Sequence, residues 1–92
     1  MNDEVQEILN ILQEECAEVI QAISKCNRFG PDQCKYDSDI TNMQHLQQEL
    51  GDVLAMIELL VNQNVGVSNE AISEAKLRKF DKLKRWSKIT IS

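Results

Sequence analysis

The stretch that most constrains this chain is Leu46–Val61, LQQELGDVLAMIELLV, in which two of the three carboxylates fall among the apolar residues when it is read as a helix. Read as a helix at about 100° per residue, its aliphatic side chains cover an arc of roughly 220°, and Glu49 and Asp52 fall inside that arc. Because an ionised carboxylate is strongly disfavoured in an apolar site, each of the two must be paired, protonated or bound to a cation. We therefore expect the rest of the chain to provide the partner groups or the cation site that this acidic pair requires.

The 92 residues have the length of one domain, 1–92, with a modest core. No apolar run approaches the roughly 20 residues of a membrane span, and we expect no signal peptide and no membrane partner. The three cysteines lack CxxC spacing, which favours a reducing, cytoplasmic setting. An apolar arc this broad in so small a chain also predicts that another subunit covers part of it.

Charge is unevenly distributed along the chain. The net charge is −5, yet seven of the ten lysines and arginines lie between Lys76 and Lys88. A globally acidic protein is a poor binder of nucleic acid, so no stable nucleic-acid partner is expected. The basic segment can either contact phosphate or neutralise the acidic part of the chain.

Three helical segments and no strand pattern predict an all-α fold, a helical bundle of three main helices completed by homo-oligomerisation. The first helix should run from about Asp3, with a capping box to Gln6, as far as about Asn27. A loop follows over 28–40, and Gly30-Pro31 stops the first helix, because glycine tolerates a left-handed cap and proline cannot continue a helix. This loop contains Phe29 and Tyr36 and is either a flap over a ligand or a solvated connector.

The second helix should begin at a capping box formed by Thr41 and Gln44 and continue to about Asn64, with Gly66 as its C-terminal cap. Ser68 or Asn69 can cap the third helix, which should extend to about Lys88. The expected apolar face of this helix consists of Ile72, Ala75, Phe80, Leu83 and Trp86.

Two i, i+3 carboxylate pairs carry the chemistry, Glu15 with Glu18 and Glu49 with Asp52. Each pair lies on one helix face, and antiparallel packing of the first two helices would bring the pairs together. One or more divalent cations would relieve the resulting repulsion, and ligands that are all oxygen suit Mg²⁺ or Mn²⁺. A di-iron site, which typically uses Glu-x-x-His pairs, is a poor fit. The alternative is that these carboxylates are solvated surface or structural groups.

The pattern Glu14-Glu15-Cys-Ala-Glu18, followed on the next helix by Glu49-Leu-Gly-Asp52, resembles the EExxE…ExxD motif of the MazG-like all-α nucleotide pyrophosphohydrolases. The resemblance implies Mg²⁺-dependent hydrolysis of a nucleoside triphosphate to the monophosphate and pyrophosphate, by a homodimer or a dimer of dimers. It also implies that Glu15, Glu18, Glu49 and Asp52 are the metal ligands. Glu14 is then a candidate to orient or deprotonate the attacking water.

Lys76 and Lys79 project onto the apolar face of the third helix. In one interpretation, they lay their aliphatic stems on the edge of the core and keep their ammonium groups in water. In the other, the third helix packs beside the carboxylates and both lysines bind the triphosphate and stabilise the departing pyrophosphate.

Three other assignments stay open at this point. The related phosphoribosyl-ATP pyrophosphohydrolases share the bundle and the chemistry. A non-enzymatic acidic helical module could instead use the wide apolar face to bind a partner, and would show no response to Mg²⁺ or Mn²⁺. A coiled-coil assembly piece fits less well, because the apolar period drifts from strict heptads.

Overall fold

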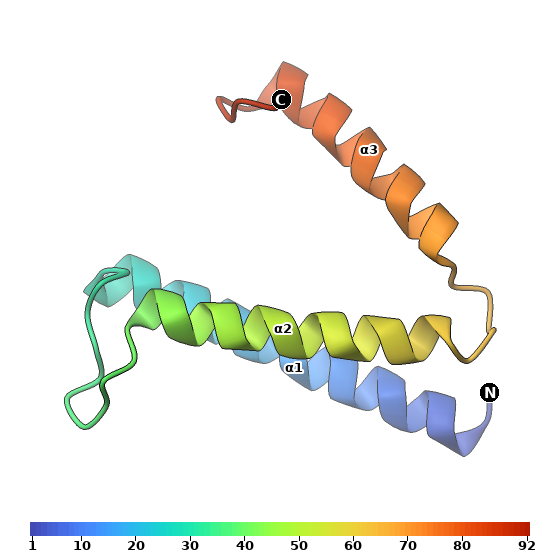
Figure 1. Ribbon diagram of the computed structural model, residues 1–92, viewed down its shortest axis with the longest axis horizontal. Helices are drawn as coiled ribbons and strands as arrows, with labels where there is room; N and C mark the ends of the chain where they lie inside the picture. Colours follow the sequence, from blue (N-terminus) through green and yellow to red (C-terminus); the bar gives the residue numbers. More distant parts are fainter.

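The computed structural model describes residues 1–92 and contains three α-helices and no strand: α1 (Asp3–Phe29), α2 (Asn42–Val61) and α3 (Asn69–Trp86). Helices α1 and α2 form an antiparallel hairpin, whereas α3 runs away from it (Figure 1). The all-α class is therefore confirmed. The expected bundle of three helices is not formed within one chain, because α3 makes almost no contact with the other two helices.

Helix α1 begins at Asp3, as predicted, but its N-cap is a different residue. The side chain of Asn2, rather than a capping box of Asp3 and Gln6, accepts a hydrogen bond of 2.8 Å from the Val5 N–H. At the other end, Gly30 adopts a φ of 99° and its N–H donates back to the last turn of the helix. That positive φ is accessible to glycine without strain, as predicted for this cap.

Helix α2 begins at the predicted capping box. Thr41 Oγ1 accepts a hydrogen bond of 3.0 Å from the Gln44 N–H, and Gln44 Oε1 accepts one of 2.9 Å from the Thr41 N–H. The helix ends at Val61, three residues before the predicted end, and its cap is not Gly66. Asn64 at φ 55° and Gly66 at φ 96° instead belong to the turn that leads to α3.

Helix α3 is capped by Ser68, whose hydroxyl accepts a hydrogen bond of 3.1 Å from the Ala71 N–H. This cap was one of the two predicted. The helix ends at Trp86, two residues before the expected boundary at Lys88.

The core of the hairpin is small and lies at one end. Val5 and Ile8 from α1 pack against Leu60 from α2. Partly buried side chains complete this cluster: Leu9, Leu12, Met56 and Val67. With Ala22, which is fully buried further along α1, only four residues of the chain are buried. A chain of this length that folds on its own normally buries more of its surface.

Large apolar surfaces are left uncovered by the chain itself. On α2, Leu54 is 66% exposed, although it belongs to the same apolar arc as the buried Leu60. Helix α3 has no buried residue, and its Leu77 and Trp86 are 68% and 84% exposed. None of the helices has both the length and the continuous apolarity that crossing a membrane requires.

We expect Thr41→Ala to lower the free energy of unfolding by about 1 kcal/mol, because it removes the hydroxyl that caps α2. Urea denaturation followed by circular dichroism measures the change. Thr90→Ala, in the exposed C-terminal segment, is the matched control and should have almost no effect. Equal loss in the two variants would show that the capping box does not contribute to stability.

Candidate metal centre

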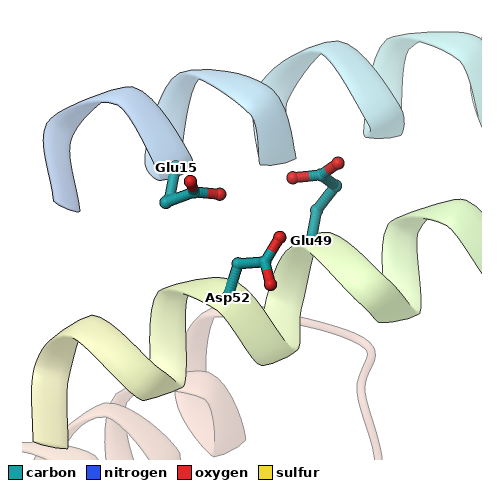
Figure 2. A group of neighbouring side chains, drawn as sticks. All are labelled: Glu15, Glu49 and Asp52. Atoms are coloured by element: carbon teal, nitrogen blue, oxygen red, sulfur yellow. The ribbon is translucent and has the colours of Figure 1, made fainter. Parts of the chain in front are cut away.

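Three carboxylates from two helices converge near the middle of the hairpin. Glu15 projects from α1, and Glu49 and Asp52 project from α2 toward it (Figure 2). One carboxylate oxygen from each residue lies within 4.8 Å of the others. Glu49 and Asp52 share a helix face because they are three residues apart, and antiparallel packing places Glu15 opposite them. We call Glu15, Glu49 and Asp52 the carboxylate trio.

Two further acidic residues that the sequence singled out do not join the trio. Glu18 is exposed on α1, one helical turn after Glu15, and Glu14 is exposed beside it. The structure therefore brings together three of the four predicted metal ligands. The roles of Glu18 as a ligand and of Glu14 as a water-activating group stay predictions.

The electrostatic cost of this arrangement is visible at Glu15. Its pKa is raised above the ordinary value of 4.5, first because the packing of the helices removes solvent from its carboxylate. The negative charges of Asp52 and Glu49 raise this pKa further, and those of Glu18 and Glu14 add to the effect. No lysine or arginine of the chain forms an ion pair with the trio.

His45 is a site residue that the sequence analysis did not single out. Its Nε2 lies 3.0 Å from Oε1 of Glu49, whose side chain is only 14% exposed. The signal was the i, i+4 spacing of the two residues along α2, which places them on one helix face. This contact occupies one carboxylate oxygen of Glu49 and fixes the direction of the other, as groups behind a metal ligand commonly do.

The trio fits a hard divalent cation. All of its donors are carboxylate oxygens, which Mg²⁺ and Mn²⁺ prefer, and no lysine or arginine competes for them. Asp52 is exposed, so one side of the trio is open to solvent. Mg²⁺ typically keeps open positions for water and substrate phosphate, and an open side provides them.

The predicted phosphate-binding lysines lie elsewhere in the single chain. Lys76 and Lys79 are both exposed on α3, which diverges from the hairpin (Figure 1). The expectation that the third helix packs beside the carboxylates is not met within one chain. Nothing within the chain holds the two ammonium groups near the trio.

A cleft of about 580 Å³ opens on the loop side of His45, between the end of α1, the loop 30–41 and the start of α2. Of the two aromatic residues in the segment predicted to be either a flap over a ligand or a solvated connector, Phe29 lines this cleft, whereas Tyr36 is 99% exposed. The lining residues are Lys25, Phe29, Gln33, Cys34, Lys35, Ser38, Ile40, Asn42 and His45. We call this space the loop cleft.

A helical hairpin that places three carboxylates across its interface defines an all-α protein with a candidate divalent-cation site. The family model of the MazG nucleotide pyrophosphohydrolase domain matches residues 3–88, nearly the whole chain. The chain therefore belongs to the MazG family of nucleotide pyrophosphohydrolase domains, as its two-part acidic motif indicated. Comparisons with curated proteins and with solved structures give no match.

The raised pKa of Glu15 gives a testable pH dependence. The folded, metal-free protein holds this proton more tightly than the unfolded chain, so stability falls as pH rises from 4.5 through the raised pKa. Glu15→Gln removes this penalty. We expect the metal-free variant to melt at a higher temperature than the parent at pH 7, with the difference disappearing below pH 4.5.

Differential scanning calorimetry with EDTA across this pH range measures the effect. Glu7→Gln changes an exposed acid of the same helix and serves as the control. An advantage of Glu15→Gln that is equal at every pH would contradict repulsion within the trio as its cause.

Proposed function

We propose that the protein hydrolyses a nucleoside triphosphate to the nucleoside monophosphate and pyrophosphate, with Mg²⁺ as cofactor and Mn²⁺ as a possible substitute. The observation that carries this proposal is the convergence of Glu15, Glu49 and Asp52 without a lysine or arginine partner. Membership of the MazG family supports the reaction class.

The charges of substrate and site require a cation. A triphosphate carries about four negative charges, and direct contact with the carboxylate trio would be strongly repulsive. Bound Mg²⁺ supplies positive charge that neutralises the phosphate oxygens and polarises the phosphoryl group. Because the trio is shared between α1 and α2, it also ties the catalytic centre to the packing of the hairpin.

Each acidic side chain then has a definite task. Glu15, Glu49 and Asp52 hold the cation, and Glu18, one turn further along α1, completes the ligand set when the cation is bound. Glu14 orients the attacking water and accepts its proton on a carboxylate oxygen. Water attacks the α-phosphorus, the bond to the bridging oxygen of the β-phosphate breaks, and pyrophosphate leaves.

The reaction is tested by incubating the purified protein with a panel of canonical and modified nucleoside triphosphates. We expect Mg²⁺-dependent release of pyrophosphate from at least one of them, and EDTA should stop it. Glu49→Gln or Asp52→Asn should lower kcat/KM at least about a hundredfold, because each removes a charged ligand. The metal-free variants should be as stable as the parent or more stable.

Glu58→Gln, an exposed acid on the same helix and outside the trio, is the matched control and should retain activity. Orthophosphate as the sole inorganic product would contradict the assignment as a pyrophosphohydrolase. Loss of several kcal/mol of stability in the metal-free variants would instead indicate that these carboxylates are structural.

We further propose that the active form is a homodimer or a dimer of dimers in which α3 of one chain lies on the hairpin of another. The uncovered apolar residues of α2 and α3 support association of two copies, since surfaces of this kind are typical of interfaces. Charge supports the same arrangement, because α3 is basic and the hairpin is acidic. Lys76 and Lys79 would then bind the triphosphate at the neighbouring trio.

Mixing two impaired variants, one altered in the trio and one altered in α3, tests this assembly. Lys79→Met keeps the aliphatic stem and should lower kcat/KM at least about tenfold. Refolding an equal mixture of Lys79→Met and Glu49→Gln chains should restore activity to as much as about a quarter of the parent, because half of the dimers are mixed and carry one intact site. Sedimentation showing a stable monomer at micromolar concentration, or a mixture without restored activity, would contradict the arrangement.

A further inference from the structure

The loop cleft carries positive charge on a protein whose net charge is −5. Lys25 from α1 and Lys35 from the loop both line it, and no aspartate or glutamate does. Neither lysine forms an ion pair with an acid of the chain. The loop contains Asp32, Asp37 and Asp39, but none of them lines the cleft. The chemistry of the cleft therefore favours an anion.

The cleft also lies next to the metal centre. His45 lines the cleft and, through Nε2, contacts Oε1 of Glu49 at 3.0 Å. Glu49 lies four positions after His45, which corresponds to a rise of roughly 6 Å along the helix. A ligand of nucleotide size can therefore occupy the cleft and reach the carboxylate trio at the same time.

The positive end of α2 does not provide the anion site by itself. Its first amide groups are already bonded, since the Asn42 N–H donates to the Gln33 carbonyl at 2.8 Å and the Met43 N–H donates to the Pro31 carbonyl at 3.0 Å. The next N–H groups of the helix donate to Thr41. An anion in the cleft must therefore be bound by groups other than these amides, and the two lysines are the side chains of the lining that carry a permanent positive charge.

The remaining walls suit the uncharged part of a nucleotide. Phe29 and Ile40 provide apolar surface. The Arg28 guanidinium lies 4.8 Å from the centre of the Phe29 ring, so at most one ring face is free for a heterocycle. The Asn42 side chain donates to the Gly30 carbonyl at 2.9 Å, and this bond fixes the amide so that its oxygen remains available as an acceptor.

We propose that the loop cleft binds a phosphate group of the substrate directly, without a metal ion, through the ammonium groups of Lys25 and Lys35. This inference rests on the proposed function, because it takes the substrate to be a nucleotide whose reacting phosphate lies at the carboxylate trio. The bound phosphate belongs either to the polyphosphate tail or to a second phosphate carried by the nucleoside. Both sources present the same chemistry to the two lysines.

Binding to the EDTA-treated protein tests the cleft separately from the metal centre. Calorimetry should show that inorganic tripolyphosphate or adenosine 3′,5′-bisphosphate binds, whereas adenosine does not. Tighter binding of the bisphosphate than of adenosine 5′-monophosphate would assign the site to a phosphate on the nucleoside. Tripolyphosphate binding as tightly as ATP would assign it to the polyphosphate tail. Nuclear magnetic resonance should place the perturbed signals in the loop 30–41.

A charge-matched pair of variants makes the test specific. Lys25→Gln combined with Lys35→Gln should weaken binding at least about tenfold, because charged hydrogen bonds to phosphate are lost. Lys82→Gln combined with Lys84→Gln removes the same charge from exposed positions on α3 and should change binding less than about twofold. Equal weakening by both pairs, or no binding of any phosphate ligand, would overturn the inference.

The failures of the two proposals are distinguishable. If pyrophosphate is released with Mg²⁺ but no phosphate binds in EDTA, the cleft inference alone is overturned. If phosphate binds at the cleft but no triphosphate is hydrolysed with Mg²⁺, the proposed function alone is overturned.

Discussion

The mutual repulsion of Glu15, Glu49 and Asp52 is the constraint on which the rest of the structure depends. Two helices bring these carboxylates within 4.8 Å of one another and supply no lysine or arginine to neutralise them. The raised pKa of Glu15 records this conflict between packing and charge. Functional sites often retain such unfavourable arrangements, because the ligand that relieves them is the one the site binds.

The hairpin tolerates this repulsion because its apolar contacts lie at a different place along the helices. Val5, Ile8 and Leu60 pack at one end, and the fully buried Ala22 lies on the other side of Glu15. The carboxylates are thus held between two contact points rather than inside a continuous core. The capping box at Thr41 fixes where α2 starts, and so fixes which residues of α2 face Glu15.

Much of the local structure could be predicted because it depends on neighbouring residues. The Thr41 capping box and the Gly30 cap follow from short-range chemistry, and the acidic positions of α2 follow from helical periodicity. The start of α1 at Asp3 was predicted, whereas its N-cap was assigned to Asp3 instead of Asn2 because both residues are competent caps. The end of α2 was misplaced because Gly66 belongs to the turn beyond it, where Asn64 also has a positive φ.

Features that depend on segments far apart in the sequence, or on a second molecule, could not be predicted. Periodicity shows which face of α3 is apolar, but not which molecule covers that face. The contact of His45 with Glu49 is indicated by their i, i+4 spacing, but many ordinary surface pairs share that spacing, so it does not by itself identify a site residue. The loop cleft was missed because it forms only when a loop of irregular backbone folds back between the ends of two helices.

Assembly and catalysis are physically linked in the proposed enzyme. In the proposed dimer, α3 of a second copy lies on the hairpin near the exposed Asp52, and so also removes water from the neighbourhood of the carboxylate trio. Loss of water strengthens every electrostatic interaction within the site, both the repulsion among the carboxylates and their attraction for a cation. The dimer should therefore bind Mg²⁺ more tightly than the monomer, and by linkage Mg²⁺ should favour the dimer. Covering the apolar surface and binding the cation therefore favour the same assembled state.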